Sequence, residues 1–261
     1  MSAYPYYQDE LVTIYHGDCL EIMSDWVSTF AQPAFGQIAI TSPPYNMGLV
    51  PGGNGRGMYR PGANNKGGKF RDGYENYDDA LPQDKYDQWQ RDVLAVLWQV
   101  LPEDGAIFYN HKQRVEHGIA RLPLGLDFGV PLRQIITWDR GTGIGVNKRH
   151  YCSTSEFIFL LAKRDFELRD HSASGAGDLW HLGMSRDEFG HPATFPISLP
   201  AKVIETTNAR SVIDPFAGTG TTMRAAADIG IRSIGIEKSE RYCEIAAKRM
   251  QQQAFDFGGV A

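Results

Sequence analysis

The sequence predicts an α/β fold built on a mostly parallel, doubly wound sheet. Three observations support this prediction. The chain closes with a strand–helix–strand unit, it opens with a second set of alternating strands and helices, and two late strands form a hairpin that adds an antiparallel edge. The chain has 261 residues, enough to bury a core of its own. We expect a single domain over residues 1–261, because no internal repeat or linker divides it.

The closing unit is the clearest part of the pattern. Residues 212–214 form a short β-branched strand, and a glycine-containing turn follows at 216–220. Residues 221–229 have helical character and stop at a glycine, and residues 233–236 form a second buried strand that ends at Glu237. The sequence therefore predicts a strand, a glycine turn, a helix and a neighbouring strand with a carboxylate at its end.

The first two-thirds of the chain repeats the alternation. The expected elements are strands at 11–15, 37–41 and 106–109, a helix at 84–100, and the late hairpin of 133–138 and 156–161. Between them lies a glycine-rich and basic stretch, residues 48–79, which we expect to be a mobile functional loop.

Composition excludes several classes of protein. The chain is 42% hydrophobic and 22% charged, which excludes wholesale disorder, and no apolar run is long enough for a membrane span. Cys19, Cys152 and Cys243 are far apart, so we expect small buried side chains in a reduced cytoplasm rather than disulfides or a metal cluster. A net charge of −5 argues against a protein that coats nucleic acid, yet it permits a local basic rim.

The glycine turn at 216–220 is typical of a nucleotide or nucleoside site. A P-loop would require a Gly-Lys-Ser/Thr sequence, and no lysine is present. A dinucleotide fingerprint would require a third glycine where Met223 stands. A nucleoside without phosphates, such as S-adenosylmethionine (SAM), fits the turn, and Glu237 can then accept both ribose hydroxyls. A tight turn that binds no ligand is the alternative.

A second pattern, Thr41-Ser42-Pro43-Pro44-Tyr45, ends another predicted strand. Two prolines fix the backbone and remove two N–H donors, which leaves a rigid group of acceptors beside an aromatic ring. Ser42 Oγ and the Pro43 carbonyl can accept the two hydrogens of a ring-bound amine while Tyr45 stacks on the ring. A polyproline turn without a ligand is the alternative.

Together the two patterns resemble the permuted β group of DNA amino-methyltransferases, which methylate adenine N6 or cytosine N4. The resemblance runs from Val12 to Met250, with the catalytic motif at Ser42–Tyr45 and the SAM motif at Asp214–Thr222. It implies a SAM-dependent methyltransferase sheet of seven mostly parallel strands with one antiparallel strand. The catalytic segment precedes the SAM segment in this group.

The resemblance also implies roles for individual residues. Catalysis is assigned to the Ser42, Pro43, Pro44 and Tyr45 segment. Asp18 takes the amino group of the SAM adenine, Glu237 takes the ribose, and the segment 191–196 closes over the methionine half. Phe195 stands where the family often has a lysine, which leaves the partner of the SAM carboxylate open. The full expected cofactor set is Asp18, His191, Pro192, Asp214, Phe216, Gly218, Gly220, Thr221 and Glu237.

Double-stranded DNA is the implied partner, and a homodimer is what the family implies. A duplex hides the target amine, so the base must be flipped out of the stack. We expect the loop 48–79 to close on DNA, and residues 165–190 to form a short target-recognition insertion. The expected phosphate contacts are Arg56, Arg60, Lys66, Lys69, Arg71, Arg140, Lys148 and Arg149.

The choice of base rests on two conflicting signals. Serine at position 42 resembles the cytosine-N4 form of the motif, whereas Asn46 followed by Gly48 is more like adenine-N6 members. We expect adenine N6, with cytosine N4 as the alternative. Two further alternatives are a DNA-binding regulator that has lost catalysis, and a methyltransferase that acts on RNA or on a protein amide.

Overall fold

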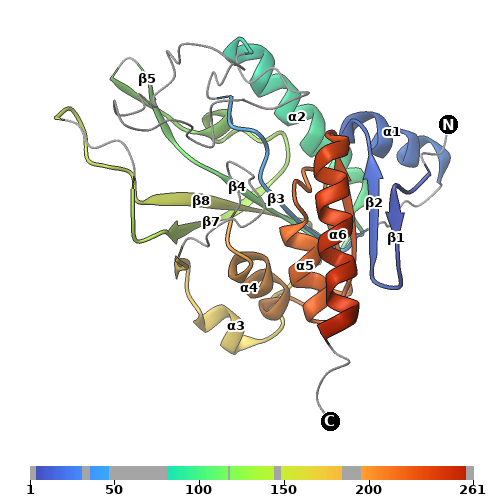
Figure 1. The fold of residues 1–261 in the computed structure, drawn as a ribbon. Helices are drawn as coiled ribbons and strands as arrows, with labels where there is room; N and C mark the ends of the chain where they lie inside the picture. The colour runs from blue at the N-terminus through green and yellow to red at the C-terminus, as the bar shows by residue number, and fades with distance from the viewer. Residues whose placement is uncertain are drawn as a thin grey trace, which may run out of the picture.

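The computed structural model describes residues 4–30, 36–46, 81–116, 118–143, 148–183 and 195–256. Within these residues, nine strands form one sheet in the order β1-β2-β11-β10-β3-β4-β8-β7-β9 (Figure 1). The strands of this sheet are β1 (Tyr7–Gln8), β2 (Val12–His16), β3 (Ile38–Thr41), β4 (Ala106–His111), β7 (Leu132–Asp139), β8 (Ser155–Ala162), β9 (Leu179–His181), β10 (Ser211–Asp214) and β11 (Arg232–Glu237).

Seven of these strands confirm the expected sheet. Strands β2, β11, β10, β3 and β4 run parallel, and β8 is antiparallel to both β4 and β7. The two short strands β1 and β9 were not expected. Because β9 pairs in parallel with β7, the late hairpin does not form an edge of the sheet, which corrects the sequence-based placement. A three-residue strand has too short an alternation to be recognised in sequence.

Helices cover both faces of the sheet (Figure 1). Helices α1 and α2 pack with one hydrophobic cluster on one face, and α4 and α5 pack with a second cluster on the other face. Helix α6 covers β2 in a third cluster. The helices are α1 (Cys19–Thr29), α2 (Gln83–Val100), α3 (His171–Gly175), α4 (Ser198–Thr206), α5 (Thr221–Asp228) and α6 (Glu240–Asp256), with a 3-10 turn η1 (Pro123–Leu126) and a small hairpin β5 (Arg114–Glu116) and β6 (Ile119–Arg121).

The strand sequences explain why the sheet is buried on both sides. In β3, Ile38 and Ile40 belong to one core cluster and Ala39 to the opposite one. Continuous apolar runs of this kind are typical of parallel strands that are covered on both faces. Among the described residues, no helix has the length and apolar character needed to cross a membrane.

The cysteines and the insertion differ in part from expectation. Cys19 and Cys243 are buried as predicted, whereas Cys152 is only half-buried. Residues 165–190 were expected to form a target-recognition insertion. Part of that stretch is built into the sheet, because β9 pairs with β7 and Trp180 lies in the core, and its role in target recognition stays a prediction. The loop 48–79 lies outside the described residues.

The direction of the strands places the site. The parallel strands β2, β11, β10, β3 and β4 all end at one edge of the sheet, and the antiparallel β8 begins there. Ligands bind at this edge in open α/β sheets. The residues that follow these strand ends, and those that open β8, are therefore neighbours along a single line.

Candidate active site

The catalytic segment leaves β3 and turns back against the end of β4. Ser42 Oγ lies 2.8 Å from Tyr45 Oη, which is also 3.0 Å from Asn110 Oδ1 and 3.1 Å from Glu156 Oε2. The Tyr45 ring is buried and packs on the His111 ring, with centroids 4.6 Å apart. Its role as a stacking partner for a substrate ring stays a prediction.

Backbone contacts hold this segment from behind. Tyr86 Oη donates to the Pro44 carbonyl at 2.6 Å, and the Arg114 guanidinium donates to the carbonyls of Tyr45 and Asn46 at 3.0 and 2.6 Å. A fixed backbone is what the pair of prolines predicts. The expected amine acceptors, Ser42 Oγ and the Pro43 carbonyl, therefore sit on a rigid support.

His111 completes the support as a neutral side chain. The one hydrogen of Tyr86 is used at the Pro44 carbonyl, so His111 Nε2 donates to Tyr86 Oη at 2.9 Å, and Nδ1 accepts from the Lys112 amide at 2.9 Å. Complete burial lowers the pKa of His111 to about 3. A fixed neutral tautomer orients Tyr86 toward Pro44, and no proton is exchanged at His111 near neutral pH.

A buried carboxylate joins the catalytic strand to the glycine turn. Asp214 Oδ1 accepts from Thr41 Oγ1 at 2.7 Å and from the Phe216 amide at 3.0 Å, and its Oδ2 accepts from Thr222 Oγ1 at 2.6 Å. Burial raises the pKa of Asp214 to about 6. Asp214, expected in the cofactor set, lies beneath the turn with both oxygens engaged.

The glycine turn has the form that a nucleoside site requires. Gly220 has a φ of +84°, and Glu237 accepts from the Gly218 and Ser239 amides, each at 2.8 Å. Burial raises the pKa of Glu237, and the two amide bonds oppose that shift. Thr219 Oγ1 is buried and has no hydrogen-bond partner in the described part of the chain. The Glu237 carboxylate, fixed by two amides, fits a polar ligand such as a ribose.

Asp18 and Phe216 frame the same turn. Asp18 Oδ1 caps α1 by accepting from the Leu20 amide at 3.0 Å, and Oδ2 pairs with Lys238 Nζ at 3.0 Å. Phe216 packs against Trp89 with ring centroids 5.5 Å apart. Lys238 was not predicted, although its place directly after Glu237 at a strand end is a usable signal.

A further buried carboxylate was missed by the sequence reasoning. Glu156 opens β8 at the same edge, and its Oε1 pairs with Arg140 at 3.1 Å. Arg140 also donates to the Ser153 carbonyl at 2.8 Å, and only 17% of its side chain is exposed. Arg140 was expected to contact phosphate, and the structure directs it inward. A charged residue within an apolar strand was the available signal for Glu156.

Other predicted positions divide into two groups. Lys148 and Arg149 are exposed in the connection between β7 and β8, at the edge that carries Ser42. His191, Pro192, Arg56, Arg60, Lys66, Lys69 and Arg71 lie outside the described residues, so their assignments stay predictions.

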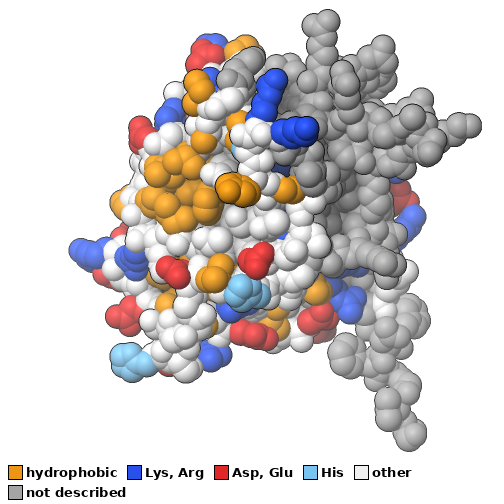
Figure 2. Space-filling view, turned by 90° about the vertical axis from the view of Figure 1, so that its left-hand side faces the viewer, with side chains coloured by type: hydrophobic (Ala, Val, Ile, Leu, Met, Phe, Trp, Pro, Cys, Tyr) orange, Lys and Arg blue, Asp and Glu red, His pale blue; other side chains and the backbone are white. Residues whose placement is uncertain are grey.

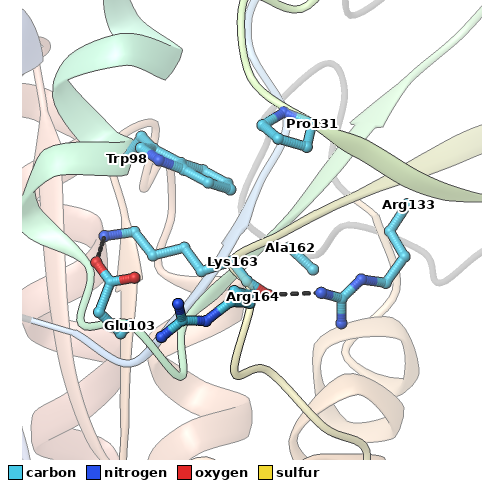
Figure 3. Close-up of a pocket in the computed structure, with 7 residues that line it drawn as sticks. All are labelled: Trp98, Glu103, Pro131, Arg133, Ala162, Lys163 and Arg164. Carbon is cyan, nitrogen blue, oxygen red and sulfur yellow. Dashed lines mark hydrogen bonds and ion pairs between the residues drawn. The ribbon is translucent and has the colours of Figure 1, made fainter.

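A cavity of about 470 Å³ lies at the opposite edge of the sheet, where β8 ends (Figure 3). Two of its cationic side chains bind backbone carbonyls. Lys163 Nζ donates to the Leu101 carbonyl at 2.6 Å, and Arg133 donates to the Lys163 carbonyl at 2.6 Å. The cavity is thus a structural feature remote from the strand ends. Its lining residues are Trp98, Glu103, Pro131, Arg133, Ala162, Lys163 and Arg164.

Comparison with known proteins identifies the family. The DNA methylase family of N6 and N4 amino-methyltransferases matches residues 37–248. The chain belongs to this family. The resemblance found at Ser42–Tyr45 and Asp214–Thr222 is therefore confirmed, and so is the expectation of a DNA amino-methyltransferase.

Two relatives are similar over nearly the whole methylase. It is 25% identical to the type II methyltransferase M.BglII of Bacillus subtilis, over 94% of this chain and 70% of that protein. It is 24% identical to the type II methyltransferase M.ScaI of Streptomyces caespitosus, over 96% of this chain and 84% of that protein.

Solved structures confirm the fold of the methylase. PvuII DNA methyltransferase (cytosine-N4-specific) has a TM-score of 0.71 at 19% identity, covering 99% of this chain and 91% of that one. The crystal structure of the M1.HpyAVI–SAM complex has a TM-score of 0.61 at 20% identity, covering 92% of this chain and all of that one.

Proposed function

We propose that this methylase transfers a methyl group from SAM to the exocyclic amine of a base flipped out of duplex DNA. The observation that carries the proposal is the shared carboxylate of Asp214. Thr41 directly precedes the amine acceptor Ser42, and Thr222 is the second residue after the glycine turn. Both threonines donate to Asp214, at 2.7 and 2.6 Å. Through these two hydrogen bonds, Asp214 links the segment that carries the amine acceptor to the cofactor turn. The two segments follow the adjacent strands β3 and β10.

The chain's own residues supply orientation. An exocyclic amine is a poor nucleophile because its lone pair is delocalised into the ring. Hydrogen bonds to Ser42 Oγ and the Pro43 carbonyl favour a pyramidal nitrogen and hold it in line with the methyl donor, which supplies the proximity term of catalysis. Bound SAM provides the electrophilic methyl group. Burial raises the pKa of the Cys19 and Cys243 thiols, so neither is a ready nucleophile.

Residues of the turn would hold the cofactor. Glu237 is already oriented by two amide bonds, and each of its oxygens keeps a lone pair for a ribose hydroxyl. Asp18 lies next along the edge and would take the adenine amino group.

For the base, the two sequence signals stand as before, and the structure adds the contacts of Asn46. Its Nδ2 donates to the Leu81 carbonyl and its Oδ1 accepts from the Leu81 amide, both at 2.8 Å. Asn46 thus ties the end of the catalytic segment to Leu81. This contact does not bear on the choice of base, so adenine N6 stays the first candidate, and the serine form of the motif keeps cytosine N4 as the alternative.

Nucleoside mass spectrometry of plasmid DNA from cells that express the methylase tests the proposal. We expect a new N6-methyladenine signal that disappears in Ser42→Ala and persists in the control Ser28→Ala, whose exposed hydroxyl donates to the Asp25 carbonyl of α1. A new N4-methylcytosine signal would reverse the choice of base. No methylated nucleoside from folded, SAM-binding protein would favour the inactive regulator or a substrate other than DNA.

The family resemblance also leads us to propose a homodimer. Apolar side chains gather on one face of the molecule (Figure 2). Large hydrophobic side chains that are more than a third exposed include Ile119, Leu122, Leu126 and Ile135. Exposed apolar patches often mark contacts between proteins. Sedimentation equilibrium should give twice the mass of the chain, and a single-chain mass at all concentrations would refute the dimer.

A further inference from the structure

Glu156 is a buried carboxylate for which the proposed reaction has no role so far. Its residue exposure is 7%, and it opens β8 at the catalytic edge of the sheet. Its Oε1 pairs with Arg140 at 3.1 Å. Its Oε2 lies 3.1 Å from Tyr45 Oη and 3.3 Å from Asn110 Nδ2. A carboxylate is rarely buried unless it is paired or has a specific task.

Counting hydrogens fixes the direction of the bonds around Tyr45. The Tyr45 hydroxyl has one hydrogen, and two of its neighbours, Glu156 Oε2 and Asn110 Oδ1, can only accept. The Asn110 amide is oriented independently, because Nδ2 donates to the Phe157 carbonyl at 3.1 Å. The Tyr45 hydrogen is therefore used on this side and is not available to Ser42.

The remaining bond must then run from Ser42 to Tyr45. Ser42 Oγ donates its one hydrogen to Tyr45 Oη, 2.8 Å away. A serine hydroxyl is otherwise ambivalent, since it can donate or accept. With its hydrogen committed to Tyr45, Ser42 Oγ presents only lone pairs to a third group. A substrate amine, which must donate there, meets an acceptor that is already oriented.

We propose that Glu156 is a positioning residue that acts through Tyr45 and makes Ser42 an obligate hydrogen-bond acceptor for the target amine. This inference rests on the proposed function and deepens it. Arg140 has the supporting role of holding the other carboxylate oxygen. Reversing the Tyr45–Ser42 bond would leave two acceptors facing the Tyr45 oxygen with no hydrogen between them, which is costly in a buried site.

Glu156→Gln tests the proposal with almost no change of shape. Arg140 attracts the amide oxygen, so the amide nitrogen faces Tyr45 and donates where an acceptor stood. Asn110 Oδ1 then alone competes with Ser42 for the Tyr45 hydrogen. We expect kcat for methyl transfer to fall about tenfold, the worth of one buried hydrogen bond, while the Kd for SAM stays unchanged. Glu103→Gln, at the opposite edge, is the matched control and should keep the wild-type rate.

A double-mutant cycle separates positioning from general damage. If Glu156 acts through the Tyr45 hydroxyl, Glu156→Gln should cause no further loss of kcat in a Tyr45→Phe background. The inference would be overturned if the double variant lost kcat by the product of the two single-variant factors. A wild-type kcat in Glu156→Gln would also overturn it.

A neutron structure of the perdeuterated wild-type protein tests the same inference without any variant or activity. We expect one deuterium on Ser42 Oγ directed at Tyr45 Oη, and the Tyr45 deuterium directed at Glu156 or Asn110. A Tyr45 deuterium directed at Ser42 would refute the positioning role. A wild-type protein that methylates no DNA, together with the expected deuterium positions, would instead remove the proposed function and keep the bond direction.

Discussion

At the scale of one residue, the buried carboxylate of Asp214 lowers the free energy of unfolding at neutral pH. Its carboxylate is fully buried and accepts three hydrogen bonds, yet burial still raises its pKa to about 6 from an ordinary value of 3.8. Between these two values the folded chain binds more protons at Asp214 than the unfolded chain does. The free energy of unfolding therefore falls as pH rises through this window, by about 3 kcal/mol from this group when both states are ionised.

Asp214→Asn should remove this pH dependence, because the amide has no proton to lose. Its oxygen can still accept from Thr41 and Phe216, and its nitrogen can donate to Thr222 Oγ1. Urea unfolding at about pH 5 and about pH 7 measures the effect. We expect the wild-type protein to lose more stability over this interval than the variant does.

The difference in stability between the wild-type protein and Asp214→Asn isolates the contribution of Asp214. The pKa of Glu237 is also raised by burial, but Glu237 is present in both proteins, so its contribution cancels from the difference. Curves of stability against pH that run parallel in the two proteins would contradict the assignment to Asp214.

At the scale of elements, the glycine turn between β10 and α5 joins backbone geometry to ligand binding. Gly220 has a φ of +84°, and an added Cβ would lie 3.1 Å from the Ala246 Cβ of α6. The turn also orients the ribose-binding candidate Glu237, because the Gly218 amide donates to its carboxylate at 2.8 Å. The same residue thus sets the approach of α6 and the shape of the cofactor turn.

Gly220→Ala should destabilise the fold by about 1–2 kcal/mol, the cost of a left-handed conformation for a residue with a Cβ, and should weaken SAM binding. Gly230→Ala is a matched control. Gly230 has a φ of +78°, but an added Cβ would meet nothing within 4 Å, and it ends α5 far from the turn. Chemical unfolding and calorimetric SAM titration should show stability loss in both variants and weaker SAM binding only in Gly220→Ala. Equal SAM affinities would separate the turn from the cofactor.

The elements also show which parts of the molecule the sequence could predict. The closing unit was predictable because its turn, strand ends and helix stop are encoded within about 25 neighbouring residues, on local rules of glycine and β-branched side chains. The support of Tyr45 was not, since Glu156 is 111 positions away and Arg114 is 69 positions away. Such contacts depend on strand order, which local periodicity does not contain. The pairing of Arg140 with Glu156 was missed for the same reason, because it crosses the β7–β8 hairpin, and contact of Arg140 with phosphate stays a prediction.

At the scale of the whole molecule, charge conflicts with the proposed substrate. The chain carries a net charge of −5 and DNA is a polyanion, so contact must depend on local cations at the catalytic edge. Among the described residues, Lys148 and Arg149 are exposed cations in the connection between β7 and β8, at that edge. Arg164 and Arg210 are exposed at the opposite edge, with 84% and 70% of their side chains accessible.

This arrangement predicts that the affinity for duplex DNA depends more on where a charge lies than on the net charge of the protein. Lys148→Glu/Arg149→Glu and Arg164→Glu/Arg210→Glu add the same negative charge, but only the first pair should weaken duplex binding strongly. Each lost phosphate contact should reduce the slope of log K against log salt by about one. Fluorescence anisotropy of a labelled duplex across a salt series measures both quantities. If the two double variants lose affinity and slope equally, the effect is one of net charge alone, and DNA does not approach by the edge that carries Ser42.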